Sequence, residues 1–263
     1  MSNLKRHLAP ITDEMWSFID NEAVEILNSK LNARKVVNFV GPKGLDFAAV
    51  NTGRREELSS EVVDGVDYSK RHVLPLVELE VPFTLDLAEL EDLTRGAEDI
   101  DVDELAEAAE KLAEAENEAV LNGLDEANID GILSAAEESV EVEDDLVAPV
   151  VEATKTLVSE GIKGPYNLLL GSDLYSLLYE SKSNKGYPVK RRITNLIEGN
   201  IIYAPSLEGK GLLLPVDSED FEFVSGQDIS IGFSQQKGNE LEFFFTESFT
   251  FRVNAPEAAV VLD

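Results

Sequence analysis

The side chains that most often do chemistry in proteins are scarce in this sequence of 263 residues. It has no cysteine and two histidines, His7 and His72, which both stand among polar residues. The absence of cysteine excludes disulfides, thiol catalysis and cysteine-bound zinc, and it fits a reducing compartment. With two histidines, a Ser-His-Asp triad or a histidine-rich metal site is hard to build. We therefore expect no catalytic residues, no metal site and a protein that is not an enzyme.

Carboxylates, by contrast, are abundant, and the formal net charge is −30. The excess is concentrated between Asp86 and Asp145, where 23 acidic residues accompany two basic ones, Arg95 and Lys111. This pattern favours a solvated helical face over an acidic patch that collects metal ions or other cations, because the spacing of a calcium-binding loop is absent. It also argues against a nucleic-acid partner, because binding to phosphates requires lysine and arginine.

A basic cluster stands out against this acidic background. Its five cations lie between residues 181 and 192: Lys182, Lys185, Lys190, Arg191 and Arg192. One interpretation is an exposed loop that forms ion pairs between subunits. The other is a positively charged rim that selects small ions.

The most apolar elements of the expected scaffold lie near the two ends of the sequence. Thr12 is a candidate N-cap for a helix within residues 11–33. The apolar face of this helix has helical spacing: Met15, Phe18, Ile19, Ala23, Ile26, Leu27 and Leu31. Residues 226–263 contain three strand-like runs, Ile229–Phe233, Leu241–Thr246 and Phe249–Val253, and five of the 12 phenylalanines lie in nine of these residues. Such apolar ends must be covered, by the rest of the chain or by another copy of it.

Two elements in between also need partners. Residues 46–84 are predicted to form a long hairpin, because Asp64-Gly65 stands between β-branched residues. An isolated two-stranded ribbon is marginal in water, so it is expected to lie on another surface, for which a neighbouring subunit is one candidate. Residues 101–123 are predicted to form the longest helix. Glu116 interrupts its apolar stripe, and this carboxylate is expected either at the rim or paired with a distant arginine.

Nothing in the sequence indicates a membrane partner. The longest apolar runs are a few residues, too short to cross a bilayer. The first residues lack the apolar region of a signal peptide. We therefore expect a cytoplasmic protein that works as a homo-oligomer.

Several stretches, in their order and spacing, resemble one known family. These stretches are LKRHLAPITDEMW, Gly41-Pro42, LPLVELEVPFTLDLAELEDLTRG, Gly131-Ile132, GIKGPYNLLL, Gly186-Tyr187-Pro188, GQDISIGF and ESFTFRVNAPEAAVVL. The sequence is similar to encapsulins, of the group also labelled linocin-type bacteriocins, and the resemblance covers essentially its full length. Encapsulins are shell proteins with the major capsid fold of tailed phages.

The resemblance implies an α+β, phage major-capsid-like fold with three parts: a P domain, an A domain and an extended hairpin, the E-loop. The expected segments are 1–45 (N-terminal helix and start of the P domain), 46–82 (E-loop), 83–124 (P domain with its spine helix), 125–222 (A domain) and 223–263 (C-terminal strands of the P domain).

It further implies that copies close into an icosahedral shell of the smallest type in the family, with about 60 copies. The shell would enclose a cargo enzyme, a peroxidase or a ferritin-like iron protein, bound through the cargo's C-terminal targeting peptide. Pores would pass small solutes.

The resemblance also places two candidate sites and weakens a third. The cargo peptide would bind Leu27, Leu31, Arg34, Val36, Asp228, Ile229 and Ile231. The five-fold pore would be formed by Lys182, Ser183, Asn184, Lys185, Gly186 and Tyr187. No cofactor is expected, and a flavin is doubtful because Ala88 stands where some relatives carry a bulky aromatic residue.

The main alternative is a phage or prophage major capsid protein, which shares the fold but packages DNA. The charge of −30 disfavours it, because an interior that faces DNA should be less acidic. A hydrolase or a secreted bacteriocin is a further alternative. Neither a catalytic constellation nor an export signal supports it.

Overall fold

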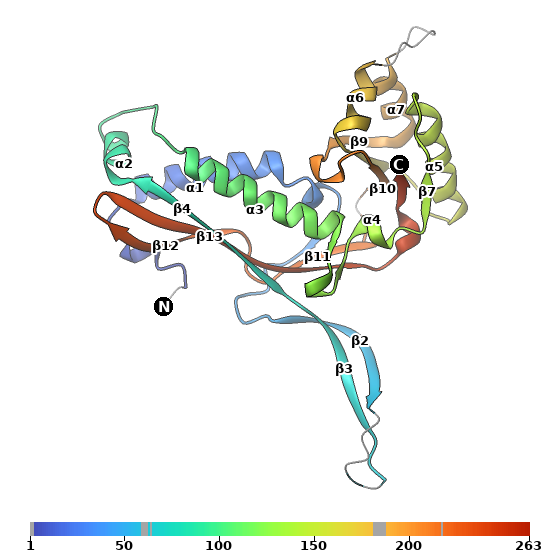
Figure 1. Cartoon of the computed structure of the whole chain (residues 1–263), viewed down its shortest axis with the longest axis horizontal. Helices are drawn as coiled ribbons and strands as arrows, with labels where there is room; N and C mark the ends of the chain where they lie inside the picture. Colours follow the sequence, from blue (N-terminus) through green and yellow to red (C-terminus); the bar gives the residue numbers. More distant parts are fainter. Residues whose placement is uncertain (1–2, 59–62, 64, 181–187, 217) are drawn as a thin grey trace.

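Two packed bodies and one projecting ribbon make up the computed structural model of this chain, which describes residues 3–58, 63, 65–180, 188–216 and 218–263 (Figure 1). The helices are α1 (Asp13–Lys30), α2 (Leu87–Thr94), α3 (Asp103–Leu121), α4 (Ile132–Ala135), α5 (Val147–Ser159), α6 (Ser172–Glu180) and α7 (Val189–Ile197). The strands are β1 (Asn38–Val40), β2 (Ala49–Leu58), β3 (Tyr68–Pro75), β4 (Val77–Asp86), β5 (Gly123–Leu124), β6 (Ile129–Asp130), β7 (Glu138–Val140), β8 (Tyr166–Leu170), β9 (Glu198–Tyr203), β10 (Gly211–Pro215), β11 (Phe221–Ser225), β12 (Ser230–Lys237), β13 (Glu240–Val253) and β14 (Val260–Leu262). Short 3-10 turns include η1 (Arg6–Leu8), η2 (Ala33–Lys35) and η4 (Pro205–Leu207).

The first body is built on the long strand β13. One edge of β13 pairs antiparallel with β4, from Glu240↔Asp86 to Phe249↔Val77. Its other edge pairs first with β12 and then with β11, which in turn pairs with β1. Because side chains alternate along a strand, Leu241, Phe243 and Phe245 all point to one face, where they are fully buried.

Helices α1 and α3 cover that face (Figure 1). Helix α1 begins as predicted, because the Thr12 side chain accepts a hydrogen bond from the backbone N–H of Met15. Its Trp16 packs edge-on against Phe243, with ring centroids 5.4 Å apart. Helix α3 contributes buried alanines and leucines, among them Leu105 and Leu112. The apolar face expected for the first helix therefore finds its partner within the same chain.

The second body is a sheet in the order β7-β14-β10-β8-β9, flanked by α5, α6 and α7 (Figure 1). Its inner strands β8, β10 and β14 are buried along their full length, which is typical of a sheet covered on both faces. One face packs on the helices, and the other belongs to a core shared with Phe221, Phe223, Phe249 and Phe251 of the first body. The two bodies are thus joined by packing as well as by the chain.

The ribbon β2–β3 extends away from both bodies (Figure 1). It is paired antiparallel from Ala49↔Pro75 to Leu58↔Tyr68, with an irregularity between Asn51 and Arg55. Most described side chains on it are exposed, and the partly buried ones lie near the end that joins the first body. A long hairpin was predicted here, and the predicted turn at Asp64-Gly65 falls partly outside the described residues.

Two features differ from the sequence-based expectation. The runs predicted as separate strands at 241–246 and 249–253 form one strand, because Glu247 and Ser248 continue the pairing with β4. Segment 223–263, expected in one domain, contributes to both sheets, because β14 inserts between β10 and β7.

Candidate functional site

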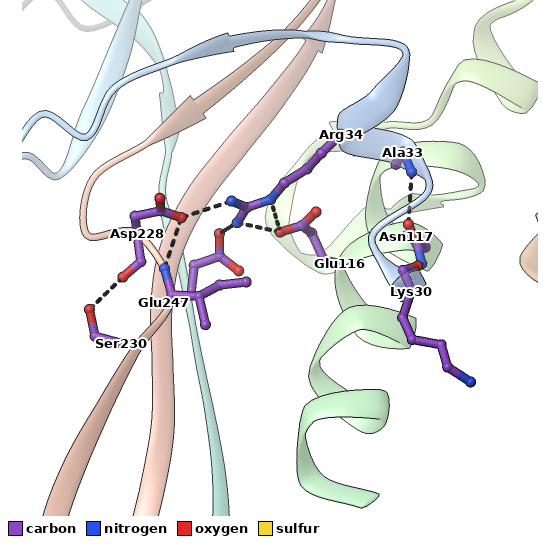
Figure 2. Close-up of polar contacts among 9 residues, drawn as sticks. Lys30, Ala33, Arg34, Glu116, Asn117, Asp228, Ser230 and Glu247 are labelled. Atoms are coloured by element: carbon purple, nitrogen blue, oxygen red, sulfur yellow. Dashed lines mark hydrogen bonds and ion pairs between the residues drawn. The ribbon is translucent and has the colours of Figure 1, made fainter. Parts of the chain in front are cut away.

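Arg34 lies at the centre of a polar network buried between the apolar elements (Figure 2). It belongs to η2, the turn that directly follows α1, and three elements bring carboxylates to it. Glu116 comes from α3, Glu247 from β13, and Asp228 from the segment before β12. Four segments far apart in the sequence therefore meet at one guanidinium group.

The contacts use both ends of the guanidinium. Its Nε donates to Glu116 Oε2 at 2.7 Å, and its Nη1 donates to Asp228 Oδ1 at 2.8 Å. Its Nη2 lies 2.6 Å from Glu116 Oε2 and donates to Glu247 Oε1. The guanidinium carbon also lies 5.1 Å from the ring centroids of Phe39 and Phe223, within cation–π range. Paired on its edges and covered on a face, Arg34 is fixed in the fold.

The three carboxylates are buried to different extents, and burial shifts the pKa values of the two glutamates. The side chains of Glu116 and Glu247 are fully buried, whereas that of Asp228 is 42% exposed. Burial disfavours the charged carboxylate, so it raises the pKa of Glu116 and raises that of Glu247 well above its ordinary value. One oxygen of each glutamate has no hydrogen-bond partner among the described residues. Burial opposes the charge of Arg34, but its bonds to the glutamates outweigh this and raise its pKa.

Asn117, the neighbour of Glu116, braces the turn that carries Arg34. Its side-chain oxygen accepts a hydrogen bond from the backbone N–H of Ala33 at 2.9 Å. Its side-chain nitrogen donates to the backbone carbonyl of Lys30 at 2.8 Å (Figure 2). These bonds satisfy backbone groups freed at the end of α1, and they tie the end of α1 to α3. A cleft of about 800 Å³ between α3 and η4 opens beside this junction, lined by Lys30 and Asn117 among others.

The residues predicted for a cargo groove lie around this network but are mostly covered. Leu27, Leu31 and Ile231 are buried in the core under α1, and Ile229 is half-buried against it. Val36 is buried in the core shared by the two bodies. Of the predicted polar pair, Arg34 bonds directly to Asp228, and Asp228 is the member of the network most open to solvent. The predicted apolar residues thus divide between two cores, and Asp228 and Ile229 are partly exposed.

Comparison with known proteins decides the family. The family model described as "Encapsulating protein for peroxidase" matches residues 1–250. A Type 1 encapsulin shell protein from Rhodospirillum rubrum is 42% identical, with 100% of this chain and 96% of the relative covered. One from Mycobacterium tuberculosis is 36% identical, covering 100% of this chain and 99% of the relative. The chain belongs to the encapsulin family of shell proteins. The resemblance stated from sequence is confirmed.

Solved structures show the same fold for this encapsulin. A virus-like particle from Pyrococcus furiosus matches with a TM-score of 0.68 at 21% identity, covering 95% of this chain and 100% of that one. The Mycobacterium phage Bobi matches with a TM-score of 0.57 at 15% identity, covering 89% and 91%. The predicted α+β, phage major-capsid-like fold is therefore confirmed. At these identities the likeness carries the fold alone.

The predicted pore residues of the encapsulin chain, 182–187, lie outside the described residues. The described positions beside them form a tyrosine cluster. The ring centroids of Tyr175 and Tyr203 lie 4.9 Å apart, and Lys190 donates to the hydroxyl of Tyr179 at 3.4 Å. That hydroxyl bonds with Tyr175, and these contacts with Tyr175 and Lys190 lower the pKa of Tyr179.

Three further predictions concern a flavin, a metal ion and a membrane. Ala88 is exposed at the start of α2. Among the described residues there is no cluster of three or more carboxylates and histidines suited to a metal ion. No helix in the described part of the encapsulin is long and apolar enough to cross a membrane.

From the sequence, Glu247 is not identified as part of the site, and Glu116 is identified only through two alternative placements. Glu116 was expected at a rim or paired with a distant arginine, and it pairs with Arg34. Glu247 could have been identified by the same pattern, a charged residue at a position expected to be apolar. It continues the alternation of Leu241, Phe243 and Phe245, so a charged residue stands at a position that faces the core.

Proposed function

We propose that this encapsulin chain assembles with about 60 copies of itself into a closed icosahedral shell that encloses a cargo protein. The observation that supports this proposal is the family membership over essentially the whole chain. A peroxidase or a ferritin-like iron protein is the proposed cargo. The description of the family model names a peroxidase, which supports the first of these two.

The ribbon β2–β3 is the proposed arm between subunits. Of the eleven large apolar side chains that are exposed in the described residues, three lie on its strands, Leu58, Tyr68 and Val73, and two lie between the strands, Val63 and Val66. A two-stranded ribbon gains little stability from its own pairing in water. Contact with a neighbouring copy would bury these side chains and stabilise the ribbon.

The junction around Arg34 is the proposed dock for the C-terminal peptide of the cargo. Asp228 and Ile229 offer a carboxylate and an apolar side chain at the surface. Leu27, Leu31, Val36 and Ile231 are buried, and in this proposal they would supply apolar packing beneath the peptide. Asp228 Oδ1 is occupied by Arg34 and by the backbone N–H of Ile229, which leaves Oδ2 for the N–H groups of an extended peptide. Weak individual docks would suffice, because many cargo copies share one shell.

The segment 182–187 is the proposed five-fold pore. Its two lysines, Lys182 and Lys185, would give a ring of five loops a positive potential that favours small anions. Replacing both by glutamate should slow anion entry and speed cation entry. Unchanged rates for both ions would contradict this role.

Electron microscopy of the purified protein, combined with mass spectrometry of its contents, tests the shell. We expect uniform closed particles that contain a second protein and no nuclease-protected nucleic acid. Absence of closed particles would overturn the proposal. Particles filled with DNA would favour a phage capsid, which the shared fold supports and the charge of −30 disfavours.

The dock is tested with a synthetic peptide of the C-terminal segment of the protein found inside. Asp228→Asn together with Ile229→Ser should weaken peptide binding to the assembled shell. The control is Glu160→Gln, an exposed carboxylate of the second body. Equal binding by the double variant, the control and the native shell would place the dock elsewhere.

A further inference from the structure

Three tyrosine rings of the second body are in contact, and Tyr175 is the middle one. Its ring centroid lies 5.8 Å from that of Tyr179 and 4.9 Å from that of Tyr203. Tyr175 and Tyr179 lie one turn apart on α6, so they share a face of the helix, and Tyr203 is the last residue of β9. Tyr175 is half-buried against the core of the second body, whereas Tyr179 and Tyr203 are 64% and 44% exposed. The middle ring is therefore anchored by packing, and the two outer rings are open to solvent in the single chain.

The hydroxyl groups distinguish the two neighbours of Tyr175. The hydroxyl oxygens of Tyr175 and Tyr179 lie 3.5 Å apart, and Lys190 Nζ donates to the Tyr179 hydroxyl at 3.4 Å. The hydroxyl of Tyr203 instead lies 3.1 Å from Ser172 Oγ. The contacts of Tyr179 with Tyr175 and Lys190 lower its pKa, so Tyr179 is the phenol of the pair that loses its proton more readily. A phenol that is losing its proton also gives up an electron more readily.

Tyrosine is the most readily oxidised kind of side chain that the described residues expose. The chain has no cysteine, and Met15 and Trp16 are buried. Cysteine and methionine are the usual first targets of oxidants, so their absence from the described surface directs oxidation to phenols. Tyr68 is also exposed, but it lies on the ribbon β2–β3, far from α6 (Figure 1). The contacts on α6 and β9 therefore bring oxidisable rings together at one place.

We propose that Tyr175 and Tyr179 form a site of oxidative modification, where a one-electron oxidant joins the two rings through a carbon–carbon bond. Each phenol gives one electron to the oxidant and its hydroxyl proton to solvent, which leaves two phenoxyl radicals. The radicals couple between ring carbons adjacent to the hydroxyls, and the hydrogen on each of these carbons then moves to oxygen and restores the phenol. The fitting class of oxidant is the intermediate that a peroxidase forms from hydrogen peroxide. The two electrons and two protons released at the site reduce one hydrogen peroxide to two waters.

The geometry favours coupling of Tyr175 to Tyr179 over coupling to Tyr203. A bond between ring carbons adjacent to the hydroxyls leaves the two hydroxyls side by side, and those of Tyr175 and Tyr179 already lie so. The ring planes of this pair are inclined at 57°, which suits the twist about a bond that joins two rings. The exposed ring of Tyr179 can close the remaining gap by rotation, which takes picoseconds to nanoseconds for an exposed side chain. The link would fix one turn of α6, shortly before segment 182–187.

Brief photo-oxidation of the purified native protein tests the site, with tris(bipyridine)ruthenium(II) and persulfate as the source of a small one-electron oxidant. We expect dityrosine fluorescence from chains that still migrate as monomers on a denaturing gel. Tyr175 and Tyr179 lie in one tryptic peptide, residues 164–182, which should lose two hydrogen atoms in mass spectrometry. A link to Tyr203 would instead join this peptide to another one. The measurement needs no closed particle, so its outcome is independent of the proposed assembly.

Phenylalanine variants keep each ring and remove its hydroxyl. Tyr175→Phe and Tyr179→Phe should each abolish the loss of two hydrogen atoms and most of the monomer fluorescence. The matched controls Tyr203→Phe and Tyr68→Phe should keep both signals. A link that persists in either of the first two variants, or that joins the peptide of Tyr203, would overturn the inference. So would dityrosine confined to chains of dimer size, or native protein that forms none.

Discussion

At the scale of single residues, the Arg34 network combines one cation with three carboxylates, two of them fully buried. Burial raises the pKa of Glu116 and of Glu247, so the folded chain binds protons that the unfolded chain has released. The resulting contribution to stability is fully present below the ordinary glutamate pKa of about 4.3. It is lost as the pH rises through the raised values. Each such proton changes the free energy of unfolding by about 1.4 kcal/mol per pH unit in that window.

Replacing Glu247 by glutamine should therefore reduce the pH dependence of stability. Glutamine is neutral and can still accept the hydrogen bond from Arg34. We expect Glu247→Gln to match the native protein near pH 4 and to be more stable at pH 8. Thermal unfolding of assembled protein between pH 4 and pH 9 checks this. A native-like slope in the variant would mean that Glu247 is ionised throughout.

Removing the positive charge of Arg34 should lower the stability of the folded chain. Arg34→Met leaves two buried glutamates without a counter-charge, which costs about 3–5 kcal/mol of unfolding free energy. Adding Glu116→Gln and Glu247→Gln to this variant should recover most of the loss, because no buried charge then remains unpaired. Denaturant unfolding of the two variants makes the comparison. An equal loss in both would show that packing of the Arg34 side chain, rather than charge, stabilises the junction.

At the scale of elements, β13 carries the core of the first body on one face. The rings of Trp16, Phe83 and Phe233 surround Phe243 at centroid distances of 5.4, 5.5 and 5.8 Å. Phe243→Ala should therefore cost about 3–5 kcal/mol. The neighbouring Phe244 points to the opposite face and is partly exposed, so Phe244→Ala should cost clearly less. Chemical denaturation of both variants measures the difference, and equal costs would contradict the assigned faces.

The same strand shows how far sequence patterns reach. The alternation of apolar residues predicted strands at 241–246 and 249–253, and the N-cap at Thr12 predicted where α1 begins. Periodicity could not join the two strands, because Glu247 and Ser248 are held by pairing with β4, far away in the sequence. It likewise marked Glu116 as out of place but could not identify Arg34 or Glu247 as its neighbours. Those contacts depend on the crossing of α1, α3 and β13, which only the tertiary arrangement defines.

At the scale of the whole molecule, the ribbon β2–β3 can be removed in principle without opening a core. Its described residues belong to none of the three buried clusters. Shortening it by replacing residues 54–71 with a tight Asn-Gly turn should leave a folded chain with native-like circular dichroism. We expect this chain to sediment as small species rather than as closed shells. Shells of native size from the shortened chain would show that the ribbon is dispensable for assembly.

The pairing of β4 with β13 also sets the timing of folding. Asp86 pairs with Glu240, so β4 leaves the ribosome 154 residues before the strand that completes its sheet. The second sheet is likewise completed only after β14 is synthesised, because β14 inserts between β10 and β7. At a synthesis rate of about 5–20 residues per second, this delay is on the order of 10–30 s. If the chain assembles as proposed, we therefore expect a subunit to join a particle only after its release from the ribosome, when cargo made at the same time is already present.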